Sequence, residues 1–367
     1  MKVLMTADTV GGVWTYAMEL AGALEPHGVE VVLATMGMPL SPGQRTQARA
    51  RANVRVVEGR YRLEWMADPW LDVRRAGAWL LELEARERPD VVHLNGYAHG
   101  ALRWRAPVCV VAHSCVLSWW RAVKGTNAPP EWDAYRTAVR RGLDGADLVI
   151  APTRAMLAAL AACHGVVPRA RVIPNARDAS RFAAAAAKRP LVLAAGRLWD
   201  EAKNVSALDR VAPELPWPVY IAGDARGPDG VERTFGAARA LGRLDEAALA
   251  NWMGAAEIFV LPARYEPFGL GALEAALAGC ALVLGDIPSL REVWGDAALF
   301  VPPGDDGALA GALRALIADD ARRERLARAA RERAGRYAPA AMAREYLAAY
   351  AELRERRPGP AEAACAS

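Results

Sequence analysis

Two carboxylates in one short segment are the residues of this sequence best suited to chemistry. Glu266 and Glu274 lie in the string RYEPFGLGALEA, positions 264–275, directly after an apolar run that predicts a β-strand. Pro267 is suited to the first position of a helix, and Gly269 lets a ligand approach the backbone. We therefore predict a helix whose bare N-terminal amides favour an anion, with the two carboxylates about 9–12 Å apart along its axis.

Each carboxylate also has a structural explanation. Glu266 alone would fit a side chain that satisfies the helix N-terminus, and Glu274 alone would fit a solvated helix face. Glu274 is flanked by Ala and Leu residues, however, so an ionised group there needs a partner or a ligand. The complete string favours a site in which one carboxylate contacts a sugar and the other a ribose.

A second segment carries two cations. Arg197 and Lys203 lie in AGRLWDEAKN, which begins at the end of the predicted strand Leu191–Ala195. Two cations at a strand end can hold a diphosphate that gains charge as it departs, whereas the alternative is a solvated pair bridging Asp200 and Glu201. No two Asp residues are two positions apart, so a D-x-D pair that could hold a metal beside a diphosphate is absent. We predict no metal site, because the two cations would take the metal's place.

Two further positions follow predicted strands of the first half. Gly12, in TVGGVW after the strand Val3–Thr6, would let phosphate or sugar approach the backbone, although a tight turn explains the paired glycines as well. The absence of G-x-G-x-x-G here weakens a dinucleotide dehydrogenase interpretation. His113 follows the strand Val108–Ala112, and the carboxyl end of a parallel strand lies at the ligand edge of its sheet. The alternative is a satisfied structural histidine.

The composition is that of a folded protein. The 367 residues are 53% hydrophobic and 24% charged, which excludes a disordered scaffold. The formal net charge is +4, but acidic residues are interleaved through most Arg-rich stretches, so we predict no nucleic-acid surface. The five cysteines contain no C-x-x-C pair and fit thiols in a reducing compartment.

No signal peptide or membrane span is predicted. The N-terminus reaches the carboxylate of Asp8 too early for a signal peptide, and the apolar stretch Ala275–Leu284 is far shorter than the ~20 residues that cross a bilayer. We expect a cytoplasmic protein. The predicted loop Trp119–Lys124, WWRAVK, is a candidate for contact with an acceptor or for peripheral contact with the inner face of the membrane.

Short apolar runs alternate with amphipathic helical patterns along the chain, which is typical of parallel sheets covered by helices. Besides those given above, the predicted strands are Val29–Ala34, Val91–Leu94, Leu148–Ala151, Val219–Ala222, Ile258–Leu261, Ala281–Leu284 and Leu299–Val301. The predicted helices include one to Cys163 capped by Thr153, then Asp306–Ile317, Ala321–Ala334, and a last helix with Met342, Tyr346, Tyr350 and Leu353 on one face.

The stretch 174–190 interrupts this alternation and is the best linker candidate. The predicted organisation is a first domain over 1–178, a linker over 179–190, a second domain over 191–335, a helix over 336–357 that packs back on the first domain, and a frayed tail over 358–367. Two open parallel sheets in one chain place their carboxyl edges around a cleft, which suits an anionic ligand.

The segment 264–275, taken together with the other site residues, resembles the family 4 retaining glycosyltransferases of the GT-B architecture. The similarity is continuous over residues 191–303 and looser over the first 178. The resemblance implies two Rossmann-like domains facing a central cleft. The second domain would bind the donor nucleotide, and the first would select the acceptor.

The resemblance also implies roles for single residues. The family residue matching Glu266 contacts donor-sugar hydroxyls, the one matching Glu274 holds the ribose, and those matching Arg197 and Lys203 hold the donor diphosphate. The interval from Arg197 to Lys203 is one residue longer than in the commonest form of the motif. Further implied contacts come from the backbone of Phe268, Gly269 and Leu270 to sugar or phosphate, from Gly12 to the donor phosphate, and from Leu244 to the base.

In the same family a histidine matching His113 lies near the donor sugar. It would orient that sugar and shield the developing oxocarbenium ion. Asn95, Gly96 and His99 are candidates to face the acceptor. In VIPNARD, Arg177 replaces the valine of the family's interdomain stretch, so we predict a hinge there rather than a ligand contact.

The predicted function is a retaining, metal-independent glycosyltransferase. It would move a hexose-type sugar from a UDP- or GDP-sugar, as substrate and with no cofactor, to a glycan, a lipid-linked saccharide or a small molecule. A leaving phosphate oxygen would take the acceptor's proton on the same face, and a covalent Glu or Asp intermediate is the competing mechanism. The alternatives are a nucleotide-sugar epimerase of the same architecture and a catalytically silent nucleotide-sugar binding protein.

Overall fold

The computed structural model describes residues 1–167, 169–227 and 230–356. The chain divides into two compact units. Unit 1 comprises residues 1–120, 127–176 and the chain from Pro339, and unit 2 comprises residues 121–126 and 177–338. The segment 179–190, predicted as a linker, is grouped with unit 2, and the predicted tail 358–367 lies outside the described residues.

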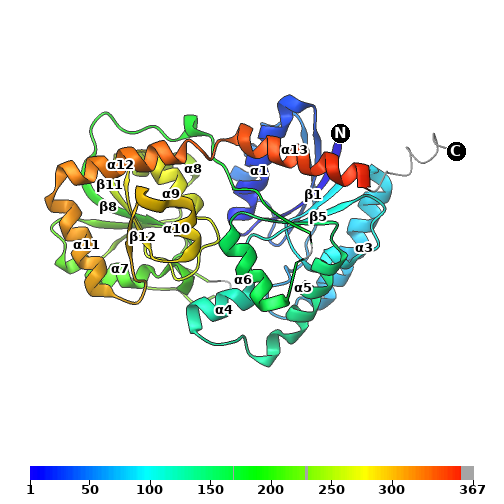
Figure 1. The fold of residues 1–367 in the computed structure, drawn as a ribbon, viewed down its shortest axis with the longest axis horizontal. Coiled ribbons are helices and arrows are strands. Elements are labelled where there is room, and N and C mark those ends of the chain that lie inside the picture. The colour runs from blue at the N-terminus through cyan, green and yellow to red at the C-terminus, as the bar shows by residue number, and fades with distance from the viewer. Residues whose placement is uncertain (168, 228–229, 357–367) are drawn as a thin grey trace. The chain divides into compact units, whose positions relative to one another are not determined.

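Unit 1 is built on a seven-stranded parallel sheet in the order β3-β2-β1-β4-β5-β6-β7. Figure 1 labels β1 and β5 of this sheet. Its strands are β1 (Lys2–Asp8), β2 (Glu30–Met36), β3 (Val54–Glu58), β4 (Val91–Leu94), β5 (Val108–Val111), β6 (Leu148–Ala151) and β7 (Ala170–Val172). The helices of unit 1 are α1 (Gly12–Leu24), α2 (Pro42–Arg49), α3 (Trp70–Glu87), α5 (Asp133–Gly145), α6 (Arg154–His164) and α13 (Pro339–Arg356). Helix α4 (Val116–Lys124) begins in unit 1 and ends in the segment 121–126 grouped with unit 2.

Unit 2 is built on a six-stranded parallel sheet in the order β10-β9-β8-β11-β12-β13. Its strands are β8 (Arg189–Ala195), β9 (Val219–Ala222), β10 (Arg239–Gly242), β11 (Ala256–Leu261), β12 (Ala281–Gly285) and β13 (Leu299–Val301). Its helices are α7 (Val205–Val211), α8 (Glu246–Ala255), α9 (Leu270–Leu277), α10 (Pro288–Trp294), α11 (Asp306–Ala318) and α12 (Asp320–Ala334).

Both faces of the unit 2 sheet are covered by helices. Leu193 and Phe259, paired across β8 and β11, belong to one apolar cluster, and their neighbours Val192 and Ile258 belong to another. Successive residues of a strand point to opposite faces, so a sheet buried on both faces needs continuous apolar runs. This is why the central strands can be read directly from the sequence.

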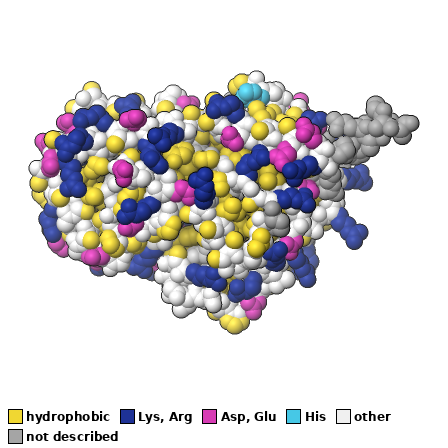
Figure 2. Space-filling view, viewed as in Figure 1, with side chains coloured by type: hydrophobic (Ala, Val, Ile, Leu, Met, Phe, Trp, Pro, Cys, Tyr) yellow, Lys and Arg dark blue, Asp and Glu magenta, His cyan; other side chains and the backbone are white. Residues whose placement is uncertain are grey.

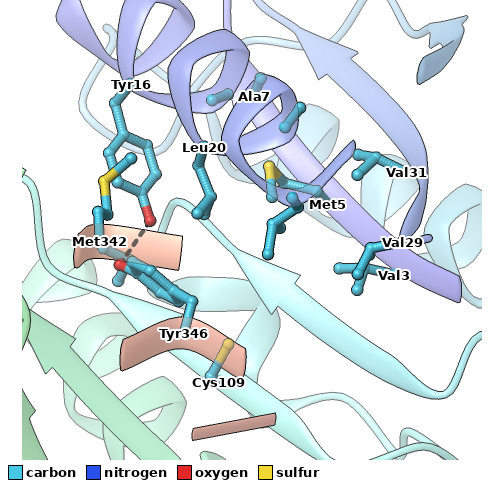
Figure 3. Close-up of a cluster of buried hydrophobic side chains, with 14 of the residues drawn as sticks. Val3, Met5, Ala7, Tyr16, Leu20, Val29, Val31, Cys109, Met342 and Tyr346 are labelled. Carbon is cyan, nitrogen blue, oxygen red and sulfur yellow. Dashed lines mark hydrogen bonds between the residues drawn. The ribbon is translucent and has the colours of Figure 1, made fainter. Parts of the chain in front are cut away.

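Helix α13 packs within unit 1, against α1. The predicted stripe of Met342, Tyr346, Tyr350 and Leu353 is buried there, in one cluster with residues of β1 and α1. Figure 3 shows the Tyr346 hydroxyl facing that of Tyr16 on α1, and the two oxygens are 2.5 Å apart. A helix that follows the last strand of unit 2 thus completes the core of unit 1.

Every strand predicted from the sequence is present, and Thr153 caps α6 as predicted, its hydroxyl accepting from the amide of Met156 at 3.0 Å. Three strands were missed: β3, β7 and β10. All three are edge strands, and each carries an arginine. An edge strand has a neighbour on one side only and can be partly solvated, and in these three strands charged residues interrupt the apolar run that marks a central strand. The fourth edge strand, β13, keeps an apolar sequence and was predicted.

Two local predictions were wrong. Helix α9 begins at Leu270 with Gly269 as its N-cap, so Pro267 is not at a first helical position. Gly269 adopts a left-handed φ of +92°, which breaks the backbone path between Pro267 and the helix. The segment Trp119–Lys124, expected as a loop, lies in α4, where Trp119 and Trp120 stack edge to face with their ring centroids 5.9 Å apart.

The charged side chains of both signs are intermixed on the face drawn in Figure 2. This mixing of positive and negative side chains follows from the interleaving of Arg with Asp and Glu along the sequence. Over the ranges that the structure covers, no helix combines the length and the apolar character needed to cross a bilayer.

Close backbone packing in unit 1 yields a stability prediction. A Cβ on Gly142 of α5 would lie 1.8 Å from the carbonyl oxygen of Tyr97, so Gly142→Ala should lower the free energy of unfolding by about 3 kcal/mol. Gly311 of α11 has open space around it, and Gly311→Ala should raise the unfolding free energy by about 0.5–1 kcal/mol. Urea unfolding of both variants measures these effects, and equal midpoints would contradict the packing argument.

Candidate functional site

Both sheets reverse their strand order at one pair of neighbours, β1 and β4 in unit 1 and β8 and β11 in unit 2. Open α/β sheets bind ligands outside the carboxyl ends of the strands at such a reversal, because the connecting loops diverge there. Arg197 follows β8 and Glu266 follows β11, while Gly12 follows β1 and Asn95 follows β4. The reversals therefore collect most of the predicted site residues.

Lys203 and Glu266 form an ion pair through Nζ and Oε2. Only 16% of the lysine side chain and 12% of the glutamate side chain are exposed. The other carboxylate oxygen of Glu266 accepts a hydrogen bond from the amide of Gly269 at 3.1 Å. Glu266 thus satisfies an amide at the start of α9, which was the structural explanation for this residue. It also pairs with Lys203, a cation predicted to bind the same donor.

The loop that carries Lys203 is fixed by Asn204. This residue has a left-handed φ of +54° and is buried, and its amide donates to the carbonyl oxygens of Pro262 at 3.0 Å and Pro303 at 2.8 Å. The amide of Arg264 also donates to the carbonyl oxygen of Ala202 at 2.8 Å. These bonds join the loop after β8 to the loop after β11, so Lys203 and Glu266 meet.

Arg197 contacts Asp200, with Nη2 and Oδ2 2.8 Å apart. The solvated pair of the alternative interpretation is not what forms, because the Asp200 side chain is 6% exposed and Lys203 pairs with Glu266 instead. Asp200 is buried and accepts from the amide of Ala202 at 3.0 Å. Burial raises the pKa of Asp200, but the charges of Arg197 and Lys203 outweigh burial and hold that pKa below its usual value. Arg197 remains 44% exposed, so its guanidinium stays accessible to a ligand.

Two of the loops that follow the strands of unit 2 approach each other closely at glycines. A Cβ on Gly223, after β9, would lie 1.7 Å from the carbonyl oxygen of Gly196, after β8. Phe268, whose backbone is a predicted contact, is buried with its ring 5.3 Å from that of Tyr337, and Leu270 is half-buried at the start of α9. The close approach of the loops after β8 and β9 therefore requires glycine at position 223.

Glu274 is buried, not solvated. It is 9% exposed, and its Oε1 lies 2.8 Å from Nε of Arg177, a side chain that is 2% exposed. A carboxylate in the apolar face of α9 thus has the counter-charge that its sequence context demanded. Sequence reasoning assigned Arg177 to a hinge, but the structure makes it the partner of Glu274. The sequence did contain a signal for this pairing, because Arg177 replaces an apolar residue of the family and a charge at an apolar position needs a partner.

Arg177 also binds Glu246, with Nη2 and Oε1 3.0 Å apart, and lies over the ring of Phe182 at 5.1 Å. Glu246 is the first residue of α8, two positions after Leu244, which is half-buried in the loop after β10. One guanidinium therefore connects the predicted ribose carboxylate to the segment predicted to contact the base.

In unit 1, Gly12 is the exposed first residue of α1. The loop before it is fixed by Thr9, whose hydroxyl lies 3.2 Å from the carbonyl oxygen of Met36 and 2.7 Å from that of Met38. Gly12 thus belongs to an anchored loop that leads into a helix N-terminus.

His113 follows β5 and is half-buried, with its Nε2 2.7 Å from Oδ1 of Asn95 and its ring edge-on to Tyr16 at 4.5 Å. Burial, assisted by the nearby His93, lowers the pKa of His113 to about 3, so its imidazole is neutral at ordinary pH. His99, expected to face the acceptor, is instead buried against α3, with its Nε2 3.0 Å from the carbonyl oxygen of Val73.

Gly12, His113 and the acceptor candidates Asn95, Gly96 and His99 lie in unit 1. The other residues predicted to bind the donor lie in unit 2, where Lys203 meets Glu266. Across residues 1–167, 169–227 and 230–356, no three side chains of His, Cys, Asp and Glu gather as metal ligands. Four cysteines in these ranges, Cys109, Cys115, Cys163 and Cys280, form no disulfide.

Two family models match this chain. Residues 10–181 match Glycosyltransferase Family 4, and residues 189–319 match Glycosyl transferases group 1. A curated relative, the glycogen synthase of Mycobacterium tuberculosis (strain ATCC 25618 / H37Rv), is 29% identical over 98% of this chain and 97% of its own length.

Solved structures share the fold. Sucrose-phosphate synthase from Thermosynechococcus elongatus has a TM-score of 0.80 at 20% identity, covering 97% of this chain and all of its own. Anabaena HepE in complex with UDP-glucose has a TM-score of 0.76 at 18% identity, covering 96% of this chain and 100% of its own. Both are GT-B proteins, and this chain has the same two-sheet architecture.

The Arg177–Glu274 pair yields a second stability prediction. Arg177→Met leaves Glu274 buried without its counter-charge and should lower the unfolding free energy by about 3–5 kcal/mol. The matched control is Arg181→Met, since Arg181 also pairs with Glu246 but is 36% exposed, so its loss should cost less than about 1 kcal/mol. The double variant Arg177→Met/Glu274→Leu should recover stability in urea titrations, and equal losses in the two single variants would refute the buried-pair assignment.

The buried histidines predict a pH dependence. Burial lowers the pKa of His93 to about 4 and that of His113 to about 3. The unfolded chain binds protons on these imidazoles below about pH 6.5, whereas the folded chain does not, so stability falls as pH drops from 6.5 toward 4. His113→Gln should remove about 1–2 kcal/mol of that loss between pH 6.5 and 5 in urea titrations, whereas His27→Gln, at an exposed position, should leave it unchanged.

Proposed function

Because this chain belongs to family 4 of the glycosyltransferases and has their GT-B fold, we propose that it transfers a hexose from a UDP- or GDP-sugar, with retention of anomeric configuration and without a catalytic metal. The observation that carries the proposal is the pairing of Lys203 with Glu266 at the reversal between β8 and β11. A cation and a carboxylate held side by side suit a donor that is anionic at its diphosphate and hydroxylated at its sugar.

Unit 2 is the proposed donor-binding unit. The exposed guanidinium of Arg197 and the ammonium of Lys203 would bind the diphosphate and stabilise its growing charge as the sugar leaves. Both cations are already held by Asp200 and Glu266, so little reorganisation accompanies the reaction. Two fixed positive charges supply the stabilisation that a metal ion would otherwise give, which supports the metal-independent proposal.

Glu274 is the proposed ribose ligand. One of its oxygens is engaged by Arg177, and a carboxylate has lone pairs on both oxygens with which it can accept from the ribose hydroxyls. The same arginine fixes Glu246 near Leu244, where the base would bind against the backbone. The nucleoside end of the donor would therefore meet a pre-formed surface.

The acceptor would be selected by unit 1, where the neutral imidazole of His113 would orient the donor sugar. In the proposed retaining step the bond from the anomeric carbon to the leaving phosphate oxygen breaks, and the acceptor oxygen bonds to that carbon from the same face. The leaving phosphate takes the acceptor's proton. The related glycogen synthase and the structurally similar sucrose-phosphate synthase are named for different products. Candidate acceptors are therefore tested across classes.

The function is tested first by binding. Thermal shifts with UDP, GDP, ADP and their common sugars should show stabilisation by one nucleotide and its sugar, because a ligand selective for the native state raises the melting temperature. Slow hydrolysis of that donor in EDTA would support transfer without a metal. Retention would be supported if NMR shows that the released sugar keeps its anomeric configuration. Interconversion of the donor without acceptor would indicate an epimerase, and a shift without turnover would indicate a silent binding protein.

The donor cation yields a kinetic prediction. Lys203→Met should lower kcat/KM for the donor by about 100-fold, because the transition-state charge loses a fixed positive partner. Lys2→Met is the matched control, since Lys2 lies in unit 1 in a loose pair with Glu30 at 3.9 Å, and should keep kcat/KM. Melting temperatures check folding. A folded Lys203→Met variant with normal kcat/KM would exclude the proposed diphosphate site.

A further inference from the structure

A continuous set of hydrogen-bonding groups connects His113 to helix α13 inside unit 1. Nε2 of His113 lies 2.7 Å from Oδ1 of Asn95, and the same oxygen lies 3.2 Å from Nε2 of His93. Nδ1 of His93 lies 2.7 Å from the hydroxyl of Tyr350 on α13. His93 and Tyr350 are completely buried, so each polar atom in the set needs a partner of the correct kind.

The orientation of Asn95 is fixed by the strand next to it. Its side-chain nitrogen donates to the carbonyl oxygen of Thr6 at 2.7 Å, and its backbone amide donates to the Thr6 hydroxyl at 2.8 Å. A carbonyl oxygen can only accept, so the side-chain nitrogen must be the atom facing Thr6. Oδ1 therefore faces the two histidines, and an amide oxygen can only accept.

This orientation determines where the histidine protons lie. Because Oδ1 accepts, Nε2 of His113 must carry the hydrogen, and in a neutral imidazole Nδ1 is then an acceptor. Nε2 of His93 likewise carries its hydrogen, so Nδ1 of His93 must accept, and the hydroxyl of Tyr350 is the donor placed to supply that bond. Every group in the set has one consistent role.

Tyr16 completes the surroundings of His93 without changing this assignment. Its hydroxyl lies 3.3 Å from Nε2 of His93, where it can accept, and it donates to the hydroxyl of Tyr346. Burial lowers the pKa of both histidines, which keeps the two rings neutral and the tautomers defined. The contacts made by side chains from β1, β4, α1 and α13 are thus all consistent with a single placement of the protons.

We propose that Asn95 is a positioning residue that holds His113 as the Nε2–H tautomer, leaving Nδ1 to accept a hydrogen bond from a sugar hydroxyl, and that Tyr350 of α13 supports this arrangement through His93. The proposal rests on the proposed function, because it specifies which nitrogen of His113 carries the proton while that residue takes part in sugar transfer. It also assigns Asn95 to the histidine and not to acceptor binding.

The tautomer is measured directly by NMR on protein carrying ¹⁵N-labelled histidine. The chain has five histidines, so a His113→Gln spectrum identifies the His113 signals. In the wild type, the ring-nitrogen shifts of His113 should show protonated Nε2 and bare Nδ1 from pH 5 to 8. Asn95→Ala should produce a mixture of tautomers, whereas Asn95→Asp, which keeps an acceptor oxygen, should keep Nε2 protonated. This measurement needs no substrate, so it stands even where sugar transfer fails.

Kinetics test the consequence for catalysis. Asn95→Ala should lower kcat by about 10- to 100-fold while the donor KM changes less than about threefold, because the variant misplaces a proton and leaves the nucleotide site in unit 2 intact. Asn95→Asp should recover part of kcat. An acceptor-binding role would instead raise the acceptor KM with kcat unchanged and would overturn the proposal, as would an unaltered His113 tautomer in Asn95→Ala.

Two tyrosine variants supply a matched pair if Asn95→Ala does not fold. Tyr350→Phe and Tyr346→Phe each remove one buried hydroxyl from the same face of α13, but only Tyr350 bonds to His93. Tyr350→Phe should broaden or shift the His93 and His113 ring signals and lower kcat at least threefold more than Tyr346→Phe. Equal spectra and equal kcat in the two variants would overturn the role assigned to α13.

Discussion

Most of the charged groups in the loops near β8 and β11 and on α9 are withdrawn from water, and the architecture of unit 2 depends on pairing them. Lys203 with Glu266, Arg197 with Asp200, and Arg177 with Glu274 are three such pairs. An isolated charge at these depths would cost several kcal/mol, so each side chain constrains the loop that carries its partner. The bonds of Asn204 to two proline carbonyls fix the same loops from the backbone side.

These pairs also suit the anionic donor proposed for the unit. A cation that is already oriented by a carboxylate binds phosphate with little loss of conformational entropy, and it does not need to move as charge develops during the reaction. The pairs differ in exposure, since Arg197 is largely open to solvent while Arg177 is enclosed. In the proposed site the exposed Arg197 would contact the ligand, and the enclosed Arg177 would hold Glu274, the proposed ribose ligand.

The buried polar groups of unit 1 are neutral side chains and not ion pairs. Its reversal between β1 and β4 buries His93, Tyr16 and two tyrosines of α13 in one polar network, which is stable only when donors and acceptors match throughout. Asn95 belongs to this network and to the ligand edge of the sheet at the same time. The helix that closes the core of unit 1 is thereby connected to the histidine that follows β5.

The sequence alone determined the central strands and the amphipathic helices, because burial on both sheet faces and on one helix face imposes local patterns. It also pointed to the charged residues after β8 and β11 as the proposed site. It did not determine the edge strands β3, β7 and β10, whose partly solvated residues carry no such pattern. It also placed Arg177 in a hinge and His99 near the acceptor, since a side chain's partner lies far away in sequence: Glu274 follows Arg177 by 97 positions. Only tertiary structure decides which charges meet and which histidines are enclosed, because pairing and desolvation depend on distances that the order of residues does not contain.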